Sequence, residues 1–96
     1  YIDDIISGTR AAIDKNYACE VFNLGNHKSE LLMDVVALIE KKLNKTTEIN
    51  FLPMQLGDVV ESFADITKSE NMLGFKPKTN VKEGIEKFID WYMAYY

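Results

Sequence analysis

Apolar residues recur at every third or fourth position in two long segments of the chain, and this spacing limits what the chain can fold into. It is typical of amphipathic helices, which bury one stripe of side chains. In residues 29–43 the stripe consists of Leu32, Val35, Val36, Ile39 and Leu43. In residues 80–96 it consists of Val81, Ile85, Phe88, Ile89, Tyr92 and Tyr96.

The ends of these helices carry local signals. Ser29 is placed to cap the first of them, and lysines near residue 43 favour its negative end. Asn80 and Glu83 have the spacing of a capping box at the start of the second. We expect a shorter helix from Asp65, as its cap, to Leu73, because Gly74 favours a helix end.

A fourth helix is expected in the first 15 residues, where Asp3 or Asp4 can serve as the N-cap. Its apolar face would contain Ile2, Ile5, Ile6, Thr9 and Ile13. Three segments are predicted as strands: Tyr1–Ile2 as a strand end, residues 18–24, and residues 47–52, where Pro53 stops the run. The predicted fold class is therefore α/β, an α+β-like arrangement of helices with a few short strands in one small lobe.

Charge and composition exclude several classes of partner. The net charge is −4, Arg10 is the only arginine, and the lysines are scattered, which argues against binding to nucleic acid or an anionic membrane. No apolar run reaches the roughly 18 to 20 residues of a membrane span. Cys19 is the only cysteine, so we expect no internal disulfide, a buried thiol and a cytoplasmic protein.

Few residues offer catalytic chemistry. No Gly-x-Gly-x-x-Gly motif is present, so the chain lacks the fingerprint of a dinucleotide site. His27 is the only histidine and is expected on an exposed loop, which leaves no metal-ligand cluster. The adjacent Asp3 and Asp4 are explained more simply by the helix dipole than by acid–base catalysis. The aromatic residues near Trp91 are expected to pack on a core rather than to serve as a stacking platform.

Residues 51–79 carry details that folding alone does not require. Gly57 can adopt a positive φ in the loop after Pro53, and Asp58 beside it offers a carboxylate on an exposed turn. A simple turn remains the alternative interpretation.

Five segments, in order, resemble the NAD-dependent nucleotide-sugar epimerases of the extended short-chain dehydrogenase/reductase family, and most of all the UDP-glucuronate 4-epimerases. They are Tyr1–Ile5 (Tyr-Ile-Asp-Asp-Ile), Asn23–Gly25 (Asn-Leu-Gly), Leu52–Val59 (Leu-Pro-Met-Gln-Leu-Gly-Asp-Val), Ala64–Lys68 (Ala-Asp-Ile-Thr-Lys) and Leu73–Thr79 (Leu-Gly-Phe-Lys-Pro-Lys-Thr), followed by the pair Trp91–Tyr92. The resemblance implies that residues 1–96 are the C-terminal, nucleotide-sugar-binding lobe of such an enzyme, without its NAD-binding domain.

The resemblance also implies an activity. In the full enzyme NAD would oxidise the sugar at C4, the 4-keto intermediate would rotate, and the hydride would return to the opposite face. No tyrosine of this chain precedes a lysine by four positions, as the family's catalytic tyrosine does, so the fragment alone is expected to be inactive. The implied parent enzyme is a homodimer, and the fragment is expected to self-associate through exposed apolar surface.

Two substrate-binding residues follow from the resemblance, Gln55 toward the diphosphate and Asp58 toward the nucleoside ribose. A carboxylate can accept hydrogen bonds from two vicinal hydroxyls, and an amide can donate to a phosphate or sugar oxygen. Two positions depart from the family pattern. Leu56 stands where the family commonly has a proline, and residues 60–63 (Val-Glu-Ser-Phe) replace its more usual Pro-Ala-Thr-Tyr. A nucleotide-sugar dehydratase or decarboxylase, or a stand-alone protein-interaction module, are the alternatives.

Overall fold

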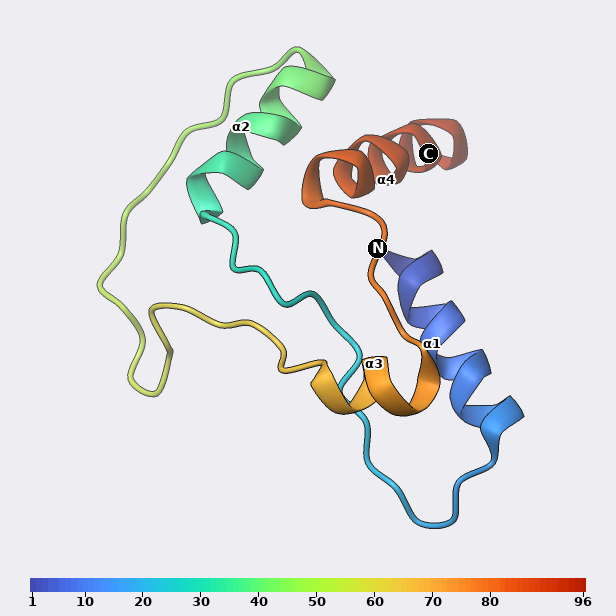
Figure 1. Ribbon diagram of the computed structural model, residues 1–96. Coiled ribbons are helices and arrows are strands. Elements are labelled where there is room, and N and C mark those ends of the chain that lie inside the picture. Colours follow the sequence, from blue (N-terminus) through green and yellow to red (C-terminus); the bar gives the residue numbers. More distant parts are fainter. The chain divides into compact units, whose positions relative to one another are not determined.

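The computed structural model describes all residues from Tyr1 to Tyr96 and contains four helices joined by coil (Figure 1). The helices are α1 (Ile2–Lys15), α2 (Leu32–Leu43), α3 (Thr67–Leu73) and α4 (Val81–Tyr95). They fall into two compact units, one formed by residues 1–29 and 63–80 and the other by residues 30–62 and 81–96. None of the helices combines the length and the hydropathy that crossing a bilayer requires.

The first unit has a small apolar core between α1 and α3. Ile66, Leu73 and Phe75 are its buried residues. Side chains from α1, from residues 22–24 and from Ala64 cover this cluster. The Tyr17 hydroxyl donates a hydrogen bond to the Met72 carbonyl (3.1 Å), which ties the end of α1 to α3.

The face of α1 that packs on this core is not the predicted isoleucine face. Ile2 is 57% exposed and Ile13 is 71% exposed, whereas Asp4 and Gly8 are buried. The predicted N-cap is also wrong, because α1 starts after Tyr1 and no side chain caps it. Asp3 and Asp4 lie in the first turn instead, where the helix dipole favours acidic residues.

Gly8 allows α1 to approach the core closely. A β-carbon at this position would lie 2.7 Å from a Leu24 methyl and 2.9 Å from the Phe75 ring. We predict that Gly8→Val lowers the free energy of unfolding by about 2 kcal/mol, because overpacking outweighs any gain in helix propensity. Urea denaturation measures the change. Thr9→Val, which puts the same side chain on an exposed neighbouring position, should shift stability far less; equal losses would contradict the close-packing explanation.

The predicted strand at residues 18–24 is absent, because tertiary contacts use its polar groups in other ways. The Asn23 backbone carbonyl accepts a hydrogen bond from the buried Ser69 hydroxyl (2.5 Å), and the Asn23 side-chain amide donates to the Asp65 carbonyl (3.2 Å). A ladder needs the backbone carbonyl to face a neighbouring strand. The segment is therefore extended chain attached to α3.

The second unit is a pair of packed helices, α2 and α4. An ion pair between the Lys42 ammonium and the Asp90 carboxylate (2.7 Å) connects them. Ile89 is the only buried residue of α4, and α2 has none, so the predicted apolar stripe of α2 is only partly covered. Ser29 does not cap α2, which begins after Leu31, although its predicted end at Leu43 is confirmed.

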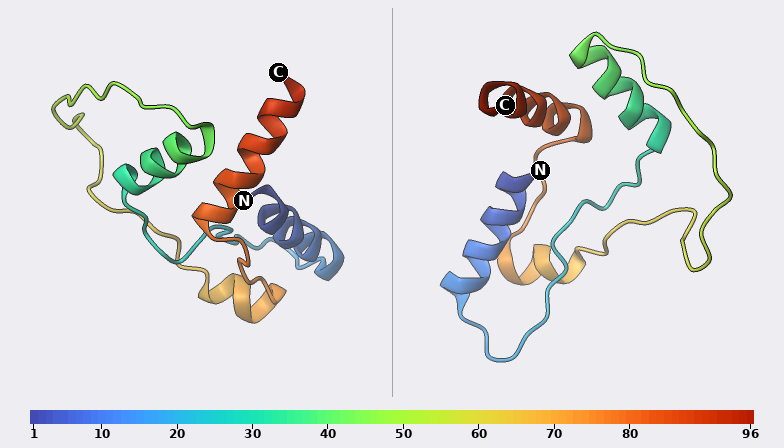
Figure 2. Two further views of the ribbon diagram at one scale, coloured as in Figure 1. Left: turned by 90° about the horizontal axis from the view of Figure 1, so that it is seen from above. Right: turned by 180° about the vertical axis from the view of Figure 1, so that it is seen from behind.

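Residues 45–62 of this unit contain no regular structure, and Figure 2 shows them as a long coil after α2. The predicted strand at residues 47–52 is therefore wrong. A strand is stable only when its backbone pairs with another, and the Thr47 amide donates to the Glu40 carboxylate (2.7 Å) instead. The predicted strand end at Tyr1–Ile2 is also absent, because Ile2 begins α1. With none of the three segments forming a strand, the predicted short strands of the α/β class are not confirmed.

Local signals predicted the third helix and its end at Leu73, although its N-cap residue is Ile66 and not the predicted Asp65. Asp65 accepts a hydrogen bond from the Thr67 backbone amide at the start of α3 (3.0 Å). Gly74 ends the helix with a φ of 68°, a left-handed conformation that glycine adopts at little cost.

Candidate functional site

The two predicted substrate-binding residues stand at the two ends of one tight turn in the coil after α2. The Asp58 amide donates a hydrogen bond to the Gln55 carbonyl (3.1 Å), which closes the turn. Gly57, the third residue of the turn, has a φ of 95°. A positive φ at this position is characteristic of a type II turn and explains the glycine.

The side chains of Gln55 and Asp58 are exposed, and neither takes part in a hydrogen bond or ion pair within the chain. The Asp58 carboxylate can accept two hydrogen bonds, and the Gln55 amide can both donate and accept. A turn that presents an acceptor and a donor of this kind can bind hydroxyl groups and an uncharged or anionic oxygen of one ligand. It supplies no positive charge of its own.

The same turn accommodates Leu56, which stands where the family commonly has a proline. Leu56 occupies the second position, where proline is favoured in type II turns, and its side chain is fully exposed at 100%. A leucine there leaves the turn geometry possible but removes the rigidity that proline gives.

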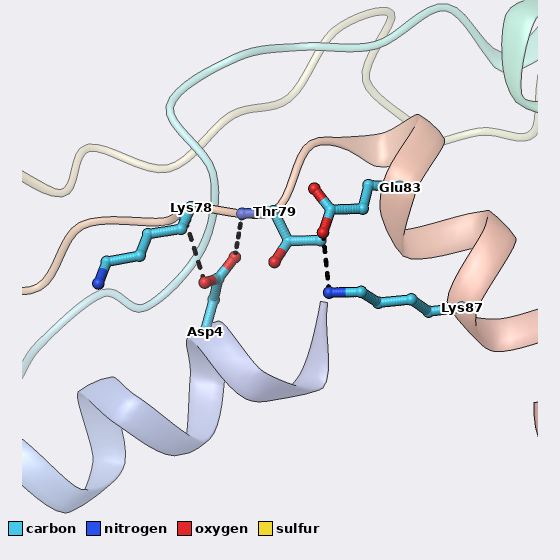
Figure 3. A network of polar contacts seen from close by, with 5 residues as sticks. All are labelled: Asp4, Lys78, Thr79, Glu83 and Lys87. Atoms are coloured by element: carbon cyan, nitrogen blue, oxygen red, sulfur yellow. Dashed lines mark hydrogen bonds and ion pairs between the residues drawn. The ribbon is translucent and has the colours of Figure 1, made fainter.

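Asp4 is a buried carboxylate whose long-range contact the sequence did not predict. It lies on α1 and accepts hydrogen bonds from the backbone amides of Lys78 (3.1 Å) and Thr79 (3.0 Å) (Figure 3). Both acceptor oxygens are thus used by the segment that follows α3. The arrangement fixes residues 78–79 against α1.

The electrostatics of Asp4 agree with this role. Burial acts to raise the pKa of the Asp4 carboxyl, but the hydrogen bonds from the Lys78 and Thr79 amides favour the charged form. The net result is a pKa below its ordinary value of 3.8. The pKa of Asp65 is also lowered, by the hydrogen bond from the Thr67 amide.

The first unit has a groove of about 610 Å³ beside α3, which the sequence gave no reason to expect. Neither Gln55 nor Asp58 lines it. Its lining combines charged side chains of both signs with apolar ones, and the Lys76 ammonium lies 3.8 Å from the Glu70 carboxylate. The lining includes His27, Phe63, Asp65, Thr67, Glu70 and Lys76.

Three further sequence-based predictions concern single residues. His27 is exposed, as predicted. Cys19 is also exposed, which contradicts the expected buried thiol; it lies in a coil with a φ of 54° and has no core beside it. Arg10 pairs with Asp14 one turn later on α1 (3.6 Å). No group of three or more potential metal ligands is brought together.

Comparison with known proteins identifies relatives along the whole chain. An uncharacterized protein of Methanocaldococcus jannaschii is 48% identical over 97% of this chain, and UDP-glucuronate 4-epimerase 4 of Arabidopsis thaliana is 34% identical over all of it. The solved UDP-glucuronic acid 4-epimerase of Bacillus cereus, in complex with UDP-glucuronic acid and NAD, superimposes with a TM-score of 0.86 at 34% identity.

The chain is a relative of the UDP-glucuronate 4-epimerases. The match to the Bacillus cereus epimerase includes all of this chain but only 31% of that enzyme's chain. It spans 28% of the Methanocaldococcus jannaschii protein and 25% of the Arabidopsis thaliana epimerase. A search of family models gave no match.

The residues of this chain do not fit an NAD site. Dinucleotides bind where a glycine-rich turn joins a strand to the N-terminus of a helix. The chain contains no strand, and the residues before its helices include no such turn. No step of a reaction that uses NAD is therefore assigned to these residues.

Proposed function

We propose that the chain is the nucleotide-sugar-binding part of an NAD-dependent 4-epimerase that acts on UDP-glucuronate. The observation that carries the proposal is the full-length superposition on an epimerase solved with UDP-glucuronic acid and NAD, at 34% identity. The match covers the whole chain, and so includes the segment that contains Gln55 and Asp58.

In this proposal the chain binds and positions the substrate. Asp58 accepts hydrogen bonds from the vicinal hydroxyls of the nucleoside ribose, and Gln55 donates to an oxygen of the diphosphate. Arg10 is paired with Asp14, so the positive charge that a diphosphate requires comes from another part of the enzyme. Hydride transfer at the sugar C4, through a 4-keto intermediate, belongs to the part that holds NAD.

A segment exchange tests the proposal. Replacing the matched segment of the Bacillus cereus epimerase with these 96 residues should preserve the binding of UDP-glucuronate and its conversion to the 4-epimer. Calorimetric titration and chromatographic separation of the two UDP-sugars give the two measurements. A chimera that folds and binds NAD, yet has lost affinity for UDP-glucuronate, would overturn the substrate-binding role.

The 96-residue chain alone is expected to give no epimerisation when mixed with NAD and UDP-glucuronate, because it contains neither an NAD site nor a tyrosine–lysine pair. The same chromatographic assay measures this, with the Bacillus cereus epimerase as the positive control. Turnover by a preparation free of other epimerases would show that the chemistry resides in this chain after all.

A further inference from the structure

Two segments far apart in the sequence come into close contact where the long coil after α2 ends. The Ala64 amide donates a hydrogen bond to the Asn26 carbonyl (3.0 Å). Gly25 lies so near Ala64 that a β-carbon added to the glycine would be 3.1 Å from the Ala64 β-carbon. Both segments belong to the first unit. We call this contact of residues 25–26 with Ala64 the junction.

Gly25 is required for its small size and not for its backbone conformation. Positive φ values among the glycines occur at Gly57 and Gly74, so the Gly25 backbone does not depend on the freedom that only glycine has. Carbon atoms of neighbouring side chains normally lie about 3.5–4.0 Å apart. A methyl group on Gly25 would therefore force Ala64 to shift by a few tenths of an ångström. The glycine sets how closely Ala64 can approach.

The chain on the α3 side of Ala64 is held in place. Ile66, two residues later, is buried in the core. The buried Ser69 hydroxyl donates to the Asn23 carbonyl (2.5 Å), and the Asn23 side-chain amide donates to the Asp65 carbonyl (3.2 Å). The residues before Ala64 are coil as far back as residue 45. A displacement of Ala64 is therefore taken up by the coil, which contains the turn with Gln55 and Asp58.

We propose that Gly25 is a positioning residue for this turn and acts on it through Ala64. The inference rests on the proposed function, in which Gln55 and Asp58 contact the substrate. Asp58 precedes Ala64 by six positions, so the chain between them spans at most about 20 Å and the junction limits where the turn can lie. A misplacement of about 1 Å can cost about 100-fold in an enzyme site, so a shift of a few tenths of an ångström is measurable.

Substitution of Gly25 in the chimera with the Bacillus cereus epimerase tests this role. Gly25→Ala should weaken UDP binding by about 5-fold, because the added methyl displaces Ala64. The KM for UDP-glucuronate should rise in step while kcat stays nearly constant, because the turn binds the nucleotide and the reaction occurs at the sugar C4. Calorimetric titration with UDP and initial rates of epimerisation give these values.

Exchanging the two residues supplies the rescue. The double variant Gly25→Ala/Ala64→Gly again has a single methyl group at the contact, so its UDP affinity should return to within about 2-fold of the parent chimera. Leu73→Val is the control for stability, because it removes a buried methylene at the far end of α3. It should lower the melting temperature without weakening UDP binding by the folded chimera.

The outcomes separate this inference from the proposed function. A parent chimera that folds and binds NAD but not UDP would overturn both. A parent chimera that binds UDP, with unchanged affinity in Gly25→Ala, would overturn the positioning role alone. An affinity loss that persists in the double variant, or that Leu73→Val reproduces, would do the same. If Gly25→Ala does not fold, the double variant decides, because it must fold and bind UDP as the parent does.

Discussion

Replacing Asp4 with alanine should lower the free energy of unfolding by about 3 kcal/mol. The substitution leaves the backbone amides of Lys78 and Thr79 without their acceptors in a partly buried contact, and an unsatisfied donor costs about 1–3 kcal/mol. Asp4→Asn keeps one good acceptor oxygen but no charge, so a loss of about half that size is expected. Urea denaturation followed by far-UV circular dichroism measures both changes.

Asp3→Ala is the matched control. Asp3 precedes Asp4 in the first turn of α1 and is exposed, so both variants lose one carboxylate near the positive end of the same helix. Only the Asp4 variants lose the hydrogen bonds to residues 78–79. Equal destabilisation by Asp3→Ala and Asp4→Ala would mean that the helix dipole, and not the contact with residues 78–79, accounts for the effect.

The lowered pKa of Asp4 gives the same contact a defined pH dependence. The folded pKa lies below the ordinary value of 3.8, so the charged form is favoured in the folded state. Its contribution to stability is complete well above pH 3.8 and is lost as the pH falls below 3.8 through the folded pKa. The difference in stability between the parent chain and Asp4→Asn should therefore be constant near neutral pH and shrink in acid.

Replacing Asp58 with alanine in the chimera should weaken the binding of UDP by about 5- to 150-fold, which corresponds to about 1–3 kcal/mol. The substrate hydroxyls would lose a charged acceptor, and Asp58→Asn should have a smaller effect because an amide oxygen still accepts. The ribose is remote from the reacting C4, so most of the loss should appear in KM rather than in kcat.

The alternative is that Asp58 only shapes the turn that Gly57 allows. In that case stability falls, and affinity falls only in step with it. Measuring UDP affinity and melting temperature on the same samples separates the two explanations. Glu48→Ala, which removes an exposed carboxylate from the same coil, serves as the control and should change neither quantity appreciably. Unchanged UDP binding by a variant with a lowered melting temperature would contradict the ligand role.

The sequence by itself determined the helices and much of their ends, because these depend on neighbouring residues. The spacing of apolar residues predicted α2 and α4, and Gly74 predicted the end of α3 from its freedom to adopt a positive φ. The turn at Gly57 followed from the same property. The epimerase-like segments were equally readable, because they are short and local.

Tertiary structure alone decided which surfaces are used. The isoleucine face of α1 was the obvious candidate for burial, yet Gly8 permits a closer approach to Leu24 and Phe75 on another face. Residues 18–24 have strand-like composition, but their polar groups bond to α3, and no helix or strand signal specifies such a partner. Asp4 meets Lys78 across 74 positions of the chain, so its local role as a helix-start acid gave no hint of the contact. Local propensity is set by a residue and its neighbours, whereas burial and pairing depend on segments that only the folded chain brings together.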